Sequence, residues 1–179
     1  MMKPIQDKQL ILFDLDGTLV DSVPDLALAV DDMLGLLGRP PAGEAKVRCW
    51  VGNGARSLVL RALADDISGD KPGHMSEAEF ERASPLFLTA YQKATAAARA
   101  SLYPDVLDTL HELSQRNIKL ACITNKPARF TEPMLEQLGL TSFFEVILSG
   151  DSLPNKKPHP EPLLHASERL QMEVRDTLM

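Results

Sequence analysis

The stretch Leu10-Ile11-Leu12-Phe13-Asp14-Leu15-Asp16-Gly17-Thr18 decides the fold of this 179-residue chain. Its first four residues are all apolar, as expected for a strand of a parallel sheet that helices cover on both faces. The two aspartates and the glycine that follow indicate a polar loop directly after the strand. Because ligands bind outside the carboxyl ends of the strands in such sheets, we expect this loop to border a pocket.

Apolar runs and helical patterns alternate in the second half of the chain. Residues 120–123 and 146–148 have the pattern of short buried strands, and helical patterns flank both. This alternation predicts an α/β fold, with a Rossmann-like parallel sheet and helices on both of its faces.

Residues 23–98 carry no strand pattern, and we expect them to form an all-helical cap inserted into the sheet domain. Within this region, Ser76 and Glu79 have capping-box spacing and predict the start of a helix. Proline removes a helical hydrogen bond, so Pro85 is expected to kink or split that helix. The predicted division is residues 1–22 and 99–179 for the catalytic core and 23–98 for the cap.

The composition argues against several classes of partner. A net charge of −6 and a pI near 5.2 disfavour nucleic acid and anionic membranes, which need a basic face. Cys49 and Cys122 lie far apart and in no metal-binding pattern, which predicts two reduced thiols. The N-terminus is polar, and no apolar run is long enough to span a bilayer. We therefore expect a cytoplasmic protein that acts on a small molecule; its oligomeric state stays open.

The aspartates Asp14 and Asp16 are candidates for the reacting groups. Side chains two apart on an extended chain point the same way, roughly 6–7 Å from one another. Two carboxylates in one pocket repel each other unless a cation binds there or one of them keeps a proton. The pattern also suits an ordinary polar turn, but the apolar strand before it and the Thr-Leu-Val after it favour a reactive pair.

Two later strand ends carry groups that could bind a phosphoryl group. The hydroxyl of Thr124 and the main-chain N–H groups of Asn125 and Lys126 follow the second strand and could donate hydrogen bonds to phosphoryl oxygens. Lys157 lies in the loop after the third strand, where Pro158 restricts its backbone, and its ammonium could offset negative charge. Separately these residues suit a turn and a solvated loop, but their joint placement at strand ends favours a site.

The same residues carry a resemblance to a known family. Residues 13–19, 123–126 and 157–160 resemble the first three motifs of the haloacid dehalogenase superfamily. Within that superfamily, the segments 21–26, 50–55 and 155–160 resemble the bacterial phosphoglycolate phosphatases most closely. The resemblance implies a Rossmann-like core, a helical cap and a Mg²⁺ cofactor bound at Asp14 and Asp16.

By this resemblance, Asp14 attacks phosphorus and forms an aspartyl-phosphate, while Asp16 protonates the leaving alkoxide and then deprotonates the hydrolytic water. Thr124 and Lys157 hold the phosphoryl group, and Thr18 and Asn125 complete the expected substrate-binding set. The implied reaction is the hydrolysis of 2-phosphoglycolate to glycolate and phosphate, a step of carbohydrate metabolism. Such chemistry depends on positioning and charge neutralisation, because a carboxylate is a weak nucleophile.

Other functions remain open from the sequence. The chain could be another capped small-molecule phosphatase or a phosphosugar mutase of the same superfamily, a non-catalytic fragment, or a module that binds phosphate or a partner without chemistry. The dehalogenase and phosphonatase branches are disfavoured, because they lack a second aspartate where Asp16 stands. In the cap, Arg48, Asn53 and Arg56 are candidate substrate contacts.

The resemblance also implies a fourth motif, a strand followed by an acidic loop that completes the magnesium site. We expect it just after Met179, beyond the end of the given chain. Asp176 is not expected to replace it, because it precedes that strand and is expected to be solvated. The sheet is therefore predicted to be incomplete at its C-terminal end, with an exposed edge. Magnesium affinity and turnover should be reduced accordingly.

Overall fold

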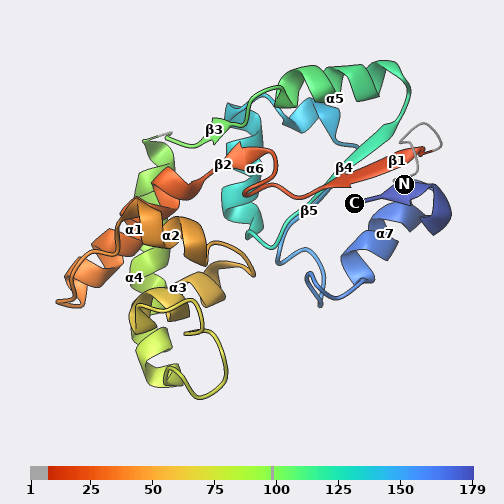
Figure 1. Cartoon of the computed structure of the whole chain (residues 1–179). Coiled ribbons are helices and arrows are strands. Elements are labelled where there is room, and N and C mark those ends of the chain that lie inside the picture. Colours follow the sequence, from red (N-terminus) through yellow and green to blue (C-terminus); the bar gives the residue numbers. More distant parts are fainter. Residues whose placement is uncertain (1–7, 98) are drawn as a thin grey trace. The chain divides into compact units, whose positions relative to one another are not determined.

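The computed structural model describes residues 8–97 and 99–179, which fall into two compact units (Figure 1). The first unit contains the residues up to Val20 together with Leu102–Met179, and the second contains Asp21–Ser101. Two short strands, β2 (Val20–Asp21) and β3 (Ser101–Leu102), pair where the chain passes between the units. The assignment of the second unit as a cap that selects substrate stays a prediction.

The first unit is built on a parallel sheet of β1 (Leu10–Phe13), β4 (Lys119–Ile123), β5 (Val146–Leu148) and β6 (Thr177–Leu178). The strand order is β5-β4-β1-β6, and each neighbouring pair is parallel. The predicted Rossmann-like α/β fold is thus confirmed. Because all the strands run the same way, their carboxyl ends share one edge of the sheet.

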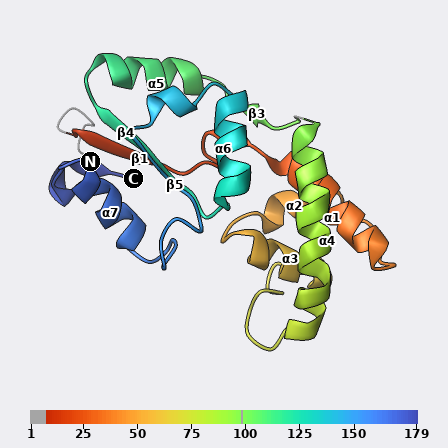
Figure 2. The same cartoon turned by 180° about the vertical axis from the view of Figure 1, so that it is seen from behind.

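Helices cover both faces of this sheet: α5 (Val106–Gln115), α6 (Ala128–Gln137) and α7 (Glu161–Arg169). Figures 1 and 2 show α5 and α7 on opposite sides of the strands. On the α7 side, Leu10 and Leu12 of β1 pack in one buried cluster with Ala166 and Leu170. Burying a leucine side chain stabilises a fold by about 1.5–3 kcal/mol, so this apolar strand anchors the loop that follows it.

β6 corrects the expected position of the last strand, which the sequence placed after Met179. Thr177 and Leu178 pair with Leu10 and Ile11, so this edge of β1 is covered over two residues. Asp176 ends a short 3₁₀ helix just before β6, and its side chain is 30% exposed. A strand of two residues carries no periodicity, which is why the sequence pattern did not reveal it.

The second unit is helical between its two short strands, over the residues that the structure describes. Its helices are α1 (Val23–Leu36), α2 (Gly43–Trp50), α3 (Ala55–Ala64) and α4 (Glu77–Ala96). Figure 2 shows α1 beside α4. Buried Asp25 near the start of α1 accepts hydrogen bonds from the main-chain N–H groups of Arg99 and Ala100, each at 3.2 Å. This contact ties the beginning of the unit to its end.

Helix α4 confirms the expected helix start at Ser76 and, of the two outcomes expected at Pro85, excludes a split. Ser76 is the N-cap, and its hydroxyl accepts a hydrogen bond from the main-chain N–H of Glu79. Pro85 lies inside the helix, however, and does not split it. Phe87 and Tyr91, both buried, stack with ring centroids 5.7 Å apart just beyond the proline. This packing favours a continuous helix despite the hydrogen bond that proline removes.

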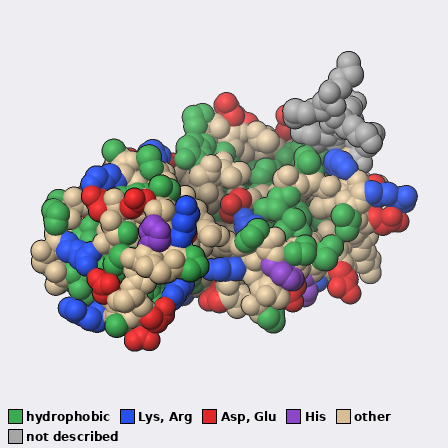
Figure 3. Space-filling view, turned by 60° about the horizontal axis from the view of Figure 1, so that its bottom comes forward, with side chains coloured by type: hydrophobic (Ala, Val, Ile, Leu, Met, Phe, Trp, Pro, Cys, Tyr) green, Lys and Arg blue, Asp and Glu red, His purple; other side chains and the backbone are tan. Residues whose placement is uncertain are grey.

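The surface carries charges of both signs. Figure 3 shows Lys and Arg side chains interspersed with Asp and Glu on the face that it presents. Within the described ranges, none of the helices combines the length and the apolar character needed to cross a membrane.

Candidate active site

The parallel strands place three loops of the first unit at the same edge of the sheet. Phe13 of β1 pairs with Cys122 of β4, and Ile123 of β4 pairs with Leu148 of β5. β4 and β5 therefore end level with each other, and β1 ends one residue earlier. Asp14 follows β1 directly, Thr124 follows β4, and the loop that carries Lys157 follows β5.

Lys157 lies against Asp14. Its ammonium nitrogen Nζ is 2.9 Å from Asp14 Oδ1 and donates a hydrogen bond to the main-chain oxygen of Ile123 at 2.6 Å. The main-chain N–H of Leu15 also donates to Asp14 Oδ1, at 2.8 Å. The Asp14 side chain is 41% exposed, whereas that of Lys157 is only 15% exposed. A mostly buried cation therefore fixes a carboxylate that solvent and ligands can still reach.

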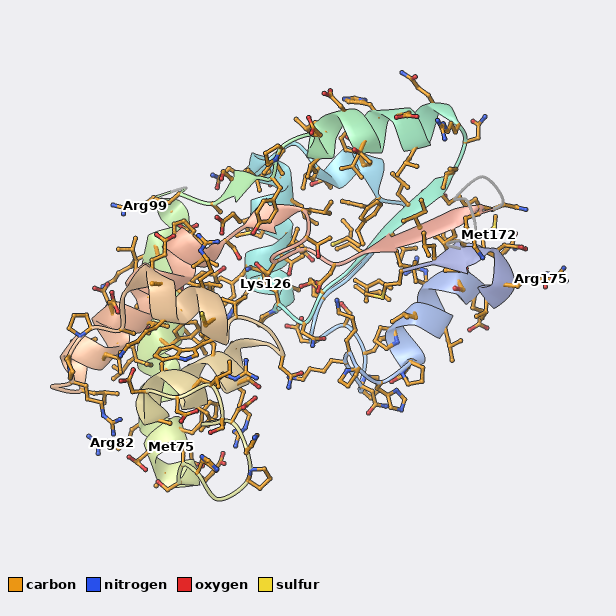
Figure 4. All side chains as sticks on the ribbon, in the orientation of Figure 1. Met75, Arg82, Arg99, Lys126, Met172 and Arg175 are labelled. Atoms are coloured by element: carbon orange, nitrogen blue, oxygen red, sulfur yellow. The ribbon has the colours of Figure 1, made fainter. Side chains whose placement is uncertain are left out.

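A second lysine, Lys126, pairs with Asp16. Its Nζ lies 2.6 Å from Asp16 Oδ1, and its side chain is only 4% exposed. Figure 4 shows Lys126 in the loop between β4 and α6. The sequence pattern predicted a role only for the main-chain N–H of Lys126, which in the structure donates to Thr124 Oγ1 at 3.2 Å, and did not reveal this side chain. Its position after a buried strand, at the edge that holds two aspartates, was the available clue.

Thr124 and Asn125 lie beside these ion pairs. Thr124 is buried, and because its Oγ1 accepts the N–H of Lys126, its own hydroxyl hydrogen remains to be donated elsewhere. Asn125 donates from Nδ2 to the main-chain oxygen of Lys157 at 2.9 Å. Its Oδ1 is buried and has no hydrogen-bond partner among the described residues. A buried acceptor without a donor is uncommon in folded proteins and suits a site that receives a ligand.

Thr18 lies apart from these contacts. It is in an exposed turn, where its N–H donates to the main-chain oxygen of Leu15. It also lines a small cavity of about 150 Å³ together with Phe13 and Pro104. Its role in substrate binding stays a prediction.

Two of the three residues expected to contact substrate, Arg48 and Arg56, have ion-pair partners within the second unit. Arg48 donates two hydrogen bonds to the carboxylate of Asp21, which raise the pKa of the guanidinium above its ordinary value. Arg56 pairs with Glu77 in the same way, and its pKa is also raised by that hydrogen bonding. Asn53 is in the left-handed region with φ of 64°. Their contact with substrate stays a prediction.

Negative charge at this edge also acts on Cys122 of β4. Burial raises the pKa of its thiol to about 12, and the charge of Asp14 acts in the same direction. A thiol with so high a pKa is protonated at neutral pH and is a poor nucleophile. Asp14 and Asp16 are therefore better candidates for the reacting groups than this cysteine.

The donor set suits a magnesium ion. Mg²⁺ prefers oxygen ligands and commonly binds through one or two carboxylates, with water and substrate phosphate completing its shell. Asp14 and Asp16 supply two carboxylates, and both described contacts of Asp14 use Oδ1, so that Oδ2 remains for a ligand. In the part of the chain that the structure describes, no group of three or more Asp, Glu, His or Cys residues could hold a metal alone.

Comparison with known proteins assigns the chain to a family. The haloacid dehalogenase-like hydrolase family matches residues 11–179. A protein of Nitrosococcus oceani named phosphoglycolate phosphatase is 45% identical over 175 residues, which cover 98% of this chain and 76% of that protein. Phosphoglycolate phosphatase 1 of Pseudomonas aeruginosa is 51% identical over 95% of this chain, and here the chain spans only 61% of the relative.

A solved structure has the same fold. The crystal structure described as a predicted phosphoglycolate phosphatase from Haemophilus somnus matches with a TM-score of 0.82 and 36% identity. The match covers 96% of this chain and 75% of that one. That structure therefore shares the fold over nearly the whole of the chain.

Proposed function

The chain belongs to the haloacid dehalogenase-like hydrolase family, and from this premise we propose that it is a phosphatase of small phosphomonoesters that uses Asp14 as its nucleophile. Its proposed substrate is 2-phosphoglycolate, in line with the names of its relatives. The chain spans 76% of the length of the first relative and 61% of the second. The activity that their names describe is therefore proposed for the whole protein.

The observation that supports the proposal most is the pairing of each aspartate with its own lysine at one edge of the sheet. Lys157 lies 2.9 Å from Asp14, and Lys126 lies 2.6 Å from Asp16. A phosphate monoester brings about two negative charges to two carboxylates, and the ammonium groups offset that repulsion. Thr124 supplies a hydroxyl donor beside them.

The residues divide the reaction into two steps. Asp14 Oδ2 attacks phosphorus, the phosphorus–oxygen bond to the alcohol breaks, and the leaving alkoxide takes a proton from Asp16. Water then attacks the aspartyl-phosphate and gives its proton to Asp16, which releases phosphate and restores the Asp14 carboxylate. Lys157 and the Thr124 hydroxyl hold the phosphoryl oxygens in both steps. Because the chemistry is mainly positioning and charge stabilisation, fixed cations and donors are the groups it needs.

Asp14 and Asp16 are also the residues that would hold Mg²⁺. When bound, the ion would supply positive charge that lowers the repulsion between these carboxylates and the substrate phosphate. The cytoplasmic location expected from the sequence belongs to the same proposal.

The test is turnover and phosphoenzyme formation by the purified chain. We would measure phosphate release from 2-phosphoglycolate and from p-nitrophenyl phosphate with and without Mg²⁺, in the wild type and in Asp14→Asn. Asp108→Asn is the matched control, because it makes the same change at an exposed position on α5. We expect magnesium-dependent turnover in the wild type and in the control, and none in Asp14→Asn.

Trapping separates an enzyme from a protein that only binds phosphate. Beryllium fluoride with Mg²⁺ mimics an aspartyl-phosphate and should raise the melting temperature of the wild type but not of Asp14→Asn. Equal turnover in the wild type and Asp14→Asn would contradict the proposal, as would a wild type that neither turns over nor responds to beryllium fluoride. Faster turnover of a phosphosugar than of 2-phosphoglycolate would redirect the substrate assignment.

A further inference from the structure

The buried ammonium of Lys126 depends on a loop that has no regular structure of its own. Lys126 lies between β4 and α6, and its side chain is among the few buried charged groups in the described residues. An ammonium held 2.6 Å from Asp16 Oδ1 in such surroundings stays there only if its main chain is fixed. The contacts that fix it are therefore part of the site.

A turn after β5 supplies two of those contacts from consecutive residues. The N–H of Gly150 donates to the main-chain oxygen of Lys126 at 2.8 Å, and Asp151 Oδ1 accepts the main-chain N–H of Ala128 at 2.8 Å. The two bonds lie on either side of Pro127, the N-cap of α6, which makes no side-chain capping bond itself. Gly150 and Asp151 thus bracket the segment that carries Lys126.

Glycine is required at position 150 because there is no room for a side chain, and not because of the backbone conformation. Its φ is outside the left-handed region, so an alanine could adopt it. A Cβ at this position would lie 2.2 Å from the main-chain oxygen of Asn125 and 2.7 Å from its carbonyl carbon. Because the obstacle is main chain, an added methyl group can be accommodated only by moving the loop that carries Thr124, Asn125 and Lys126.

We propose that Gly150 and Asp151 form a clip, defined by these two residues, that positions Lys126 and through it the carboxylate of Asp16. Both are positioning residues, since neither is placed on the reacting atoms. The inference rests on the proposed function, because Asp16 is a reacting group only in a phosphatase. The clip itself can be tested without turnover.

The first measurement is the chemical accessibility of the Lys126 amine. Acetylation of folded protein by a water-soluble N-hydroxysuccinimide ester would be followed by peptide mass spectrometry, with exposed Lys93 as internal reference. We expect Gly150→Ala to raise the relative rate at Lys126 by about tenfold, because local opening is easier. Gly35→Ala is the matched control, since a Cβ there meets nothing within 4 Å and its φ is ordinary. An unchanged Lys126 rate in folded Gly150→Ala would overturn the clip.

The second measurement is a double-mutant cycle on turnover. Gly150→Ala and Lys126→Met should each lower kcat with little change in KM, and the double variant should be no slower than the worse single variant. Fully additive losses would overturn the coupling. If Gly150→Ala does not fold, Asp151→Ala takes its place, because it removes the hydrogen bond to Ala128 without adding an atom. We expect Asp151→Ala to raise the Lys126 acetylation rate and to lower kcat, both by less than Gly150→Ala would. A raised Lys126 acetylation rate together with no wild-type turnover would support the clip and count only against the phosphatase.

Discussion

The side-chain amide of Asn125 donates to the main-chain oxygen of Lys157 at 2.9 Å, although 32 residues separate the two in sequence. This hydrogen bond ties the loop after β4 to the loop after β5. It holds the main chain of Lys157 while the side chain of the same residue reaches Asp14. The two loops that bring hydroxyl and ammonium groups to the site are thus fixed to one another.

Asn125→Ala is expected to weaken this connection. A net hydrogen bond contributes about 1 kcal/mol, which corresponds to a fall in melting temperature of about 2–4 °C for a chain of this size. The fall in kcat should be larger than this small loss of stability would cause, because Lys157 loses its fixed position. Thermal unfolding followed by circular dichroism, beside phosphate release, measures both. An unchanged kcat in the variant would show that the Asn125 bond does not position Lys157.

Asp25→Asn should destabilise the second unit. The buried carboxylate accepts two main-chain N–H groups, and an amide can replace only one of its oxygens as an acceptor. Hydrogen bonds to charged groups contribute about 1.5–3 kcal/mol, so we expect a loss in that range in urea unfolding. Asp32→Asn, an exposed position on the same helix, is the control and should change little. Equal effects of the two substitutions would refute the role of Asp25.

The pair of Arg61 and Asp70 predicts a pH dependence of the second unit. Their side chains are 14% and 13% exposed, with Nη2 and Oδ2 2.9 Å apart. Burial alone would raise the pKa of Asp70, but hydrogen bonds from Arg61 and Ser57 outweigh it and lower that pKa below its ordinary value. The stabilisation is therefore complete above about pH 4 and is lost as the pH falls through the lowered pKa.

Asp70→Asn is the variant that checks this linkage. Trp50 is the only tryptophan of the chain, and its main-chain oxygen accepts a hydrogen bond from Arg61, so its fluorescence reports on this region. In urea unfolding at pH 7 the variant should be less stable by about 1.5–3 kcal/mol, and the difference should shrink at pH 3. Asp65→Asn, at a 62% exposed carboxylate, should have a far smaller effect. A difference that does not depend on pH would contradict the assignment.

The two cysteines should differ sharply in reactivity. Cys49 is exposed, whereas Cys122 is buried with its pKa raised to about 12. At pH 8 a thiol reagent such as dithionitrobenzoate should modify one thiol per folded chain and the second only after denaturation. Mass spectrometry of the labelled peptides identifies the site. Rapid modification of Cys122 in the folded protein would argue against a closed sheet at β4.

Local sequence was sufficient for the parts of the fold and the site that depend on neighbours in the chain. The apolar run before Asp14 predicts a buried strand, and two residues on one side of an extended chain predict that Asp14 and Asp16 are placed together. The capping box at Ser76 is likewise a local hydrogen bond. The pattern alone left two interpretations of Asp14 and Asp16 open, a cation site or two carboxyl groups that share a proton. The roles proposed for the two residues came from the family resemblance.

Local reasoning failed where a distant contact decides the outcome. The pairing of Thr177 and Leu178 with β1 makes a strand of residues whose own pattern is too short to predict one. In this case a tertiary contact outweighs the weak local preference.

The sequence by itself predicted the parallel sheet and the family and proposed the aspartate pair after β1, because each follows from local patterns and motifs that are recognised without knowing which segments are in contact. Only the tertiary structure decided that Lys126 neutralises Asp16, that Asn125 holds Lys157, and that Gly150 leaves no room for a side chain. Those contacts join residues brought together by strand pairing. Hydrogen bonds and ion pairs act over a few ångströms of space, whatever the separation along the chain.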